Sequence, residues 1–358
     1  MRFFLIAVLI ILVCCGILYG ICRWILNRIF GNRQDGSPGV KYFTAADFPG
    51  LEQTPASFSS DKGQVLRGCW YYRPDAMDKP SSRRGIVIFS HGYGGGHLAY
   101  ITEINTFASW GYTVLAYDNT GTFRSDGSSL GGFPQAIADL SAAYDFVSSQ
   151  NKEHLPVFLC GHSWGAYAVC SFLSLKKPVS GAVALSPFDS VPSMLMEMLR
   201  QQTGRNWWIL KPFFRLCLLL DYGNLAMMRP SYALQESPCP VLLLHGDADT
   251  TVPLSLSPLA FRSFFENKPG MHIQVYPGKG HNVYVTAAAE QKMQQYFKDY
   301  TALVSRLHDR LRQGDPLAAE TLNNFTEEAD FKGMTEEDSL VMQQIRRFFE
   351  DLLSSSEA

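Results

Sequence analysis

The stretch PVFLCGHSWGAYAVCSFL, residues 156–173, is the part of this chain that decides its fold. It opens with a short apolar run, residues 156–160, which has the length and composition of a buried parallel strand. GHSWG (161–165) follows, and the small and apolar residues after it favour a helix. Strand, sharp turn and helix is the context in which a G-x-S-x-G turn exposes a serine hydroxyl, because the glycines relieve crowding around a strained serine. Ser163 is therefore the candidate nucleophile.

A second G-x-S-x-G match, GSSLG at residues 127–131, lacks this context. It lies among Gly and Ser residues with no apolar run before it, which is typical of a loop. We therefore interpret Ser129 as a loop residue.

Further short apolar runs extend the pattern on both sides of Ser163. Helical stretches are expected near 98–109 and over 134–149, between these runs. Strands that alternate with helices predict an α/β fold, with a mostly parallel sheet flanked by helices. An antiparallel strand is expected earlier, at 65–73. The further buried strands are GIVIFS (85–90), YTVLAYD (112–118), AVALS (around 183–186) and VLLLH (241–245).

A serine hydroxyl is a poor nucleophile unless a histidine takes its proton and a carboxylate orients that histidine. Two later segments follow strand ends and supply these groups, HGDADTTVP (245–253) and GKGH (278–281). They place Asp249 and His281 after Ser163 in the order Ser, Asp, His. Asp247 competes with Asp249, but we interpret Asp247 as a turn residue.

The segment HGYGGG (91–96) follows the expected strand 85–90 and predicts an oxyanion hole. Its glycines allow the backbone to approach a substrate closely. The expected donors are the backbone N–H groups of Trp164, directly after the nucleophile, and of Tyr93. A phosphate-binding loop is not predicted, because the pattern G-x-x-x-x-G-K-[ST] is absent.

Taken together, HGYGGG, DNTGTFRSDG (118–127), GHSWG, HGDADTTVP and GKGH resemble the α/β-hydrolase superfamily. The resemblance covers roughly residues 65–300. It is strongest to the serine aminopeptidase and monoacylglycerol lipase-like branch, and to bacterial membrane-anchored hydrolases related to it. It implies the α/β-hydrolase fold and a catalytic triad of Ser163, Asp249 and His281.

The expected activity is hydrolysis of an ester of an acyl or lipid-like substrate, through an acyl-enzyme on Ser163. No metal and no organic cofactor are required for this chemistry. The alternative is a serine peptidase or aminopeptidase with the same triad, which would need an acidic residue such as Glu197 to hold a substrate amine.

The N-terminus predicts a membrane anchor. Residues 3–22, FFLIAVLIILVCCGILYGIC, carry no charge and are long enough to span a bilayer as a helix. RWILNRIFGNR (23–33) follows with Trp24 and three arginines that suit the interface, and no A-x-A-like cleavage site is present. We expect an uncleaved, single-pass anchor in the cell membrane. The charges flanking it leave the side of the catalytic domain open.

Four regions are expected in all: a transmembrane anchor (1–30), a linker (31–62), a hydrolase domain (63–302) and a helical C-terminal extension (303–358). The linker is rich in Gly, Pro, Ser and Asp, so we expect few contacts across it and a soluble, active enzyme after removal of the first 34 residues.

Residues 189–237 interrupt the alternation of strands and helices and predict a helical lid. The lid is rich in methionine and aromatic residues, among them Met194, which suit an apolar acyl pocket. The substrate-binding candidates in it are Trp207, Trp208, Phe213 and Phe214.

The last expected helix, near 336–353, has an apolar stripe that must dock on its own domain or on a partner. Val341, Ile345, Phe348 and Phe349 belong to this stripe.

Composition adds exclusions to these expectations. The 358 residues carry a net charge of -2, so no general attraction to nucleic acid is predicted. The 8 cysteines show no C-x-x-C spacing, so neither a disulfide framework nor a zinc site is expected. The sequence leaves the oligomeric state open.

Overall fold

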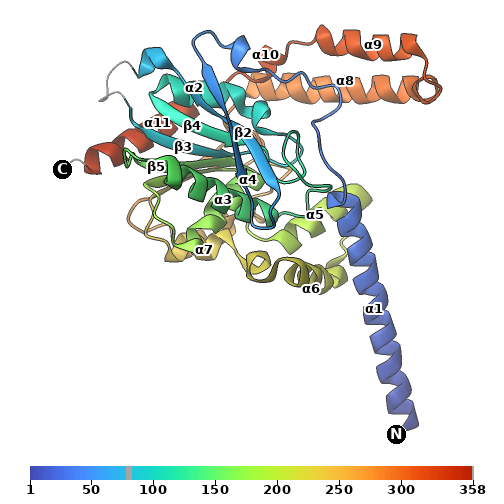
Figure 1. Cartoon of the computed structure of the whole chain (residues 1–358). Coiled ribbons are helices and arrows are strands. Elements are labelled where there is room, and N and C mark those ends of the chain that lie inside the picture. Colours follow the sequence, from blue (N-terminus) through green and yellow to red (C-terminus); the bar gives the residue numbers. More distant parts are fainter. Residues whose placement is uncertain (78–82, 357–358) are drawn as a thin grey trace.

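The computed structural model describes residues 1–77 and 83–356, and this part of the chain contains one sheet of eight strands (Figure 1). The strands lie in the order β1-β2-β4-β3-β5-β6-β7-β8. β1 and β2 are antiparallel to their neighbours, and the strands from β4 to β8 run parallel. The strands are β1 Glu52–Ser59, β2 Val65–Tyr72, β3 Gly85–Ser90, β4 Tyr112–Tyr117, β5 Val157–His162, β6 Gly181–Leu185, β7 Val241–Gly246 and β8 Met271–Tyr276.

Every residue of β3, β5, β6 and β7 is buried, so the centre of the sheet must be covered on both faces. α3, α4 and α7 pack on one face, and α2 and α11 pack on the other (Figure 1). The predicted mostly parallel sheet flanked by helices is thus confirmed. The helices are α1 Arg2–Phe30, α2 Ile101–Ser109, α3 Gln135–Gln150, α4 Trp164–Phe172, α5 Val191–Thr203, α6 Lys211–Tyr222, α7 Pro230–Glu236, α8 Ala287–Arg312, α9 Pro316–Glu327, α10 Phe331–Met334 and α11 Ser339–Ser356.

The segment predicted as a linker, residues 31–62, contains the edge strand β1. Ala56 and Phe58 are buried on its inner side, and Phe58 stacks on Phe146 with ring centroids 5.0 Å apart. Pro55 is tolerated because an edge strand has one side free of ladder hydrogen bonds. The prediction failed here because turn-forming residues outnumber the two apolar ones that fix the strand.

The C-terminal region also differs from the prediction. α8 runs continuously across the expected boundary at residue 302, and with α9 it forms an antiparallel pair beside the domain (Figure 1). α11 is part of the core that covers the sheet and not an extension. Phe349 is fully buried on the sheet, with its ring centroid 4.5 Å from that of Phe158 and 5.5 Å from that of Tyr112.

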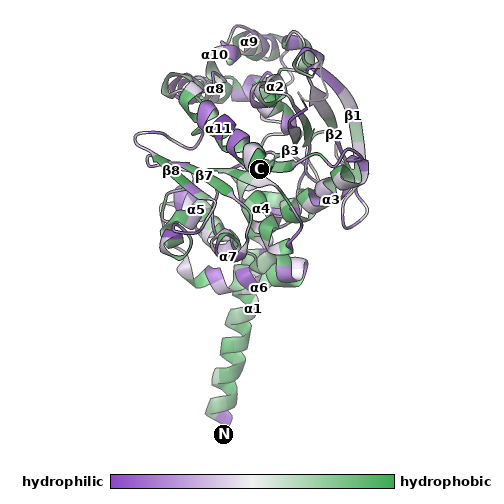
Figure 2. Ribbon diagram, turned by 90° about the vertical axis from the view of Figure 1, so that its left-hand side faces the viewer, coloured by the Kyte–Doolittle hydropathy of each residue, from purple (hydrophilic) through white to green (hydrophobic). Residues whose placement is uncertain are grey.

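The N-terminal helix α1 has two halves with different surroundings (Figure 2). Its most apolar stretch of 18 residues has no buried residues, and the helix is long and apolar enough to cross a membrane. Its last turns pack on the domain, because Cys22, Leu26 and Phe30 form a buried stripe at helical spacing. These contacts contradict the expectation that few contacts join residues 1–34 to the domain.

Candidate active site

Ser163 occupies the sharp turn between β5 and α4. Its backbone has φ 54° and ψ -113°, a conformation that costs energy for a residue with a side chain. A Cβ atom at Gly165 would lie 1.9 Å from the carbonyl oxygen of Ser90, and one at Gly161 would lie 2.6 Å from the carbonyl carbon of Gly165. Both glycines are therefore required by close backbone approach, and the turn presents Ser163 at the carboxyl end of the sheet.

Asp249 and His281 lie in the loops that follow β7 and β8, and the structure brings them together. His281 Nδ1 is 2.8 Å from Asp249 Oδ2. The other carboxylate oxygen, Oδ1, accepts from the backbone N–H groups of Thr251 at 2.9 Å and Val252 at 2.8 Å. His245 Nε2 lies 3.2 Å from Oδ2 and donates to the carbonyl of Val252 as well.

These contacts determine the ionisation of Asp249. Burial acts to raise the pKa of its carboxyl group, but the hydrogen bonds with His245 and His281 outweigh burial and hold the pKa well below its usual value. Asp249 is thus a carboxylate throughout the neutral pH range, next to His281. His245 was not predicted as a site residue, because its only signal in the sequence is its place directly before the loop.

Asp247, the competing carboxylate, has a different role. It is exposed, does not line the cavity of Ser163, and accepts from the backbone N–H of Gly278 at 2.6 Å, which joins the loops after β7 and β8. Ser129, the competing serine, lies in a loop between β4 and α3 and outside any helix or strand.

A chain of hydrogen bonds connects the loop of His281 to the loop after β3. The carbonyl oxygen of His281 accepts from Ser186 Oγ at 2.8 Å and from His162 Nε2 at 3.1 Å. His162 Nδ1 lies 2.9 Å from the hydroxyl of Tyr100, which accepts from the backbone N–H of Gly92 at 3.0 Å. Burial, reinforced by the nearby His281, lowers the pKa of His162 to about 3. His162 is therefore neutral and holds the two loops together, a role that the sequence analysis did not predict.

Ser163, His281, Tyr93 and Trp164 line one cavity of about 310 Å³. Met194 and Met198 of α5 contribute an apolar wall. Phe133 and Phe188 complete that wall, and neither was predicted because each lies in a segment without regular periodicity.

The predicted aromatic residues of the lid lie elsewhere, which corrects their assignment as substrate-binding residues. Within the described part of the chain, none of Trp207, Trp208, Phe213 and Phe214 lines this cavity. Phe214 is fully buried and Phe213 packs against the core, whereas Trp207 and Trp208 are 38% and 72% exposed. Helical spacing alone could not show which face of α6 meets the domain.

The segment 118–127 is held by a buried ion pair. His97 Nδ1 lies 2.8 Å from Asp118 Oδ1, and His97 Nε2 lies 2.9 Å from the hydroxyl of Tyr71. Burial acts to lower the pKa of His97, but the charge of Asp118 and the hydrogen bond with it raise that pKa to about 9. The pair fixes the loop after β4 against the start of the segment that leads into α2.

The mostly parallel sheet and the strained serine turn after β5 together are those of the α/β-hydrolase fold. The family model described as "Serine aminopeptidase, S33" matches residues 81–218. An esterase of Pyrococcus furiosus has the same fold with a TM-score of 0.54 and 19% identity, over 78% of this chain and 98% of that one.

Two curated relatives are similar over the hydrolase region. Lysophosphatidylserine lipase ABHD12 of Mus musculus is 24% identical over 61% of this chain and 58% of its own length. Monoacylglycerol lipase of Mycolicibacterium smegmatis is 24% identical over 59% of this chain and 85% of its own length. The chain thus spans only part of the first of these relatives.

Proposed function

We propose that this protein is a membrane-anchored serine hydrolase that cleaves carboxylic esters of a lipid-like acyl substrate. The observation that carries the proposal is the contact between His281 and Asp249 in the cavity that Ser163 lines. A nucleophile on a strained turn, a histidine and a buried carboxylate are the three groups that acyl transfer requires.

In the proposed mechanism, His281 takes the proton of the Ser163 hydroxyl as the oxygen attacks the ester carbonyl. Asp249 holds the Nδ1–H of His281, so that Nε2 is the basic nitrogen, and stabilises the imidazolium that forms. The backbone N–H groups of Tyr93 and Trp164 stabilise the oxyanion. His281 then returns the proton to the leaving alcohol, and water hydrolyses the acyl-enzyme by the same steps.

An acyl substrate is supported by the walls of the cavity. Met194, Met198, Phe133 and Phe188 present apolar surface beside the nucleophile, which favours a hydrocarbon chain. The names of the two curated relatives, both lipases, agree with this class of substrate. An aminopeptidase would need a free carboxylate, yet Glu197 is occupied by an ion pair with Arg200 and a hydrogen bond from Gln201.

Anchoring by α1 is supported by its length and by the surface beside it. Residues 3–21 would extend about 28 Å at ~1.5 Å per residue, which matches the hydrocarbon core of a bilayer. Near the end of this stretch, Leu18 and Tyr19 already pack against the domain. Arg23 forms an ion pair with Asp221 of α6 at 2.5 Å, so α6 lies beside the point where α1 leaves the domain (Figure 2). Trp208 and Leu220 are 72% and 65% exposed there. A membrane at this surface would cover these apolar side chains and remove them from water.

A substrate panel tests the proposed activity. The full chain in detergent should hydrolyse p-nitrophenyl esters and monoacylglycerols, with a preference for longer acyl chains, and should cleave aminoacyl p-nitroanilides far more slowly. Ser163→Ala should abolish turnover without a change in melting temperature, and Ser129→Ala is the matched control that should keep it. Faster cleavage of the anilides than of the esters would favour the peptidase instead.

A further inference from the structure

We infer that the end of the N-terminal helix is part of the catalytic machinery, with Phe30 acting as a positioning residue for the oxyanion loop. The inference rests on the proposed function, in which the backbone N–H of Tyr93 is an oxyanion donor. It concerns what holds that donor in place.

The side chain of Tyr93 is clamped by the last turn of α1. Its hydroxyl donates to the carbonyl oxygen of Ile29 at 3.1 Å. Its ring meets that of Phe30 edge-on, with centroids 6.1 Å apart, and Phe30 in turn meets Phe133 at 4.9 Å. The Tyr93 ring also meets that of Trp164 edge-on, with centroids 6.1 Å apart. Phe30 is only 2% exposed, so the clamp is a packed part of the core.

The contact satisfies a need at the end of the helix. The last four carbonyl groups of an α-helix have no partner within the helix. The Tyr93 hydroxyl provides one partner, for Ile29, and the backbone N–H of Leu130 provides another, for Phe30, at 3.0 Å. The loops after β3 and β4 therefore cap α1, and the position of each depends on the other.

The oxyanion loop needs such an external support. Tyr93 is followed by Gly94, Gly95 and Gly96, and Gly94 has φ 85°. A run of glycines restricts the backbone little. The conformation of the Tyr93 backbone therefore depends on contacts outside the glycine run. These are the contacts of its side chain with Phe30 and Trp164, and the hydrogen bonds of Gly92 with Tyr100 and of Gly94 with Ser37.

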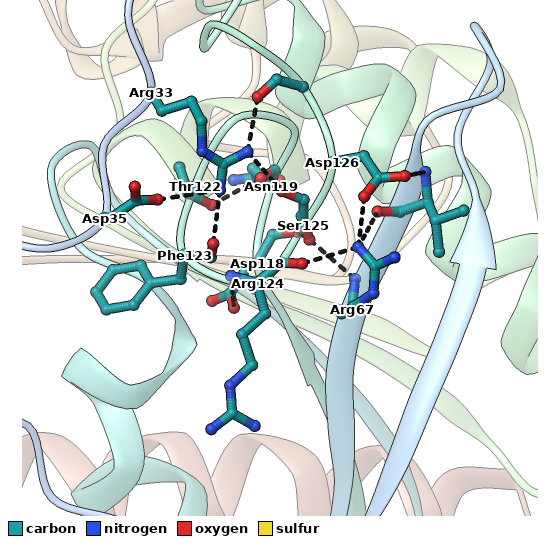
Figure 3. A network of polar contacts seen from close by, with 12 residues as sticks. Arg33, Asp35, Arg67, Asp118, Asn119, Thr122, Phe123, Arg124, Ser125 and Asp126 are labelled. Atoms are coloured by element: carbon teal, nitrogen blue, oxygen red, sulfur yellow. Dashed lines mark hydrogen bonds and ion pairs between the residues drawn. The ribbon is translucent and has the colours of Figure 1, made fainter.

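Arg33 and Gln34, which follow α1, are hydrogen-bonded to the loop after β4 (Figure 3). The guanidinium of Arg33 donates to the backbone carbonyls of Phe123 at 2.6 Å, Ser125 at 2.8 Å and Gly127 at 2.6 Å. The backbone of Gln34 forms two hydrogen bonds with the same loop. Its N–H donates to the carbonyl of Gly121 at 2.9 Å, and its carbonyl accepts from the N–H of Phe123 at 3.1 Å. α1 therefore cannot shift relative to the loops without breaking these bonds.

A positioning role predicts a specific kinetic effect. Loss of one oxyanion donor costs about 10²–10³ in kcat in other enzymes, so a displaced donor should cost about ten-fold or more. The donor acts on charge that develops only in the transition state, so KM should hardly change. A merely structural role would lower stability and the amount of active enzyme, without changing the turnover of each active site.

The experiment compares Phe30→Ala with Phe58→Ala in the full chain, each normalised by active-site titration with a fluorophosphonate. Phe58 is a matched control, because it is also a buried phenylalanine with two aromatic neighbours, Tyr117 and Phe146, but it lies on the edge strand β1. Assays use p-nitrophenyl butyrate and a trifluoromethyl ketone, whose adduct with serine carries an oxyanion.

Phe30→Ala should lower kcat and weaken inhibition by the ketone by similar factors, about ten-fold or more, with KM within about two-fold. Phe58→Ala should match wild type in all three, and Phe30→Leu should recover part of the kcat. Tyr93→Phe, which removes only the hydroxyl that binds Ile29, covers the case in which Phe30→Ala does not fold. It should lower kcat and weaken inhibition by the ketone, with KM unchanged.

Equal kcat and ketone affinity in Phe30→Ala and Phe58→Ala would overturn the inference while the proposed function stands. If Phe30→Ala does not fold, wild-type kcat in both Phe30→Leu and Tyr93→Phe would overturn it. A wild-type chain that neither hydrolyses esters nor reacts with the fluorophosphonate would instead refute the proposed function.

Discussion

Replacing Asp249 by asparagine removes one charge from the proposed triad and leaves its volume almost unchanged. In the wild type both carboxylate oxygens accept hydrogen bonds. Oδ2 accepts from His281, and Oδ1 accepts from the N–H groups of Thr251 and Val252. An amide has one oxygen and one NH₂ group, so it cannot accept on both sides. Either the NH₂ group meets the two backbone donors, or it meets His281 and forces the proton of that ring onto Nε2.

Both arrangements predict a large kinetic effect. A ring protonated on Nε2 cannot take the proton of Ser163, and the imidazolium loses its counter-charge. The corresponding change in another Ser-His-Asp enzyme costs about 10⁴ in kcat, which is ~5.4 kcal/mol in the activation free energy. The mismatched donors should also lower the free energy of unfolding by about 1–3 kcal/mol.

The assay is turnover of p-nitrophenyl butyrate at pH 7.5, followed together with the melting temperature. Asp247→Asn is the matched control, since it makes the same change two residues away, at a side chain whose hydrogen bond within the described residues is to Gly278. It should keep kcat within about ten-fold. Loss of less than ten-fold in Asp249→Asn, or an equal loss in Asp247→Asn, would refute the assignment of the carboxylate.

Three further outcomes follow from the packing and the ion pairs. Phe349→Ala should lower the free energy of unfolding by about 3–5 kcal/mol, because it opens a cavity under α11; denaturant titration measures this, and a kcat that also falls steeply would show that α11 builds the site. Removal of residues 1–17 should leave kcat and melting temperature unchanged, whereas removal of 1–34 should lower both, and an intact, fully active 35–358 chain would contradict the packing of α1. The raised pKa of His97, about 9 against an ordinary 6.5, means that its pair with Asp118 stabilises the fold fully below pH 6.5 and less as the pH rises through 9. The difference in melting temperature between wild type and His97→Gln should therefore shrink from pH 6.5 to pH 9.5, and a constant difference would show that His97 is neutral in the fold.

The sheet could be predicted because its central strands are apolar throughout. β3, β5 and β7 are buried on both faces, so their sequences need no alternation and stand out from the surrounding loops. Ser163 and Asp249 follow β5 and β7, and His281 follows β8. Because ligands bind beyond the carboxyl ends of the strands in a parallel sheet, the sequence was enough to predict that these loops converge.

The remaining features depend on contacts between segments that are distant in sequence. The apolar stripe of α11 required burial, but the sequence could not show that the sheet, and not a partner, buries it. The aromatic residues of the lid were predicted to line the cavity, yet Trp208 is exposed in the turn before α6, and α6 directs Phe214 into the core. His162 and His245 support the site through hydrogen bonds that no motif encodes.

The N-terminal helix shows the same limit. Its apolar run ended at Cys22 in the sequence, but Cys22, Leu26 and Phe30 pack on the domain. A helix that is apolar on all sides gives no indication of which turns contact lipid and which contact protein. The role inferred for Phe30 arises from this part of α1.

The most direct test of the central claim is to map the residue that a fluorophosphonate modifies in the folded full-length chain. Intact mass followed by peptide mass spectrometry should show one phosphonyl group, on Ser163. The adduct should be lost in Ser163→Ala and retained in Ser129→Ala. A natively folded chain that takes up no phosphonate, or an adduct that persists in Ser163→Ala, would contradict the claim that Ser163 is the activated nucleophile of a serine hydrolase.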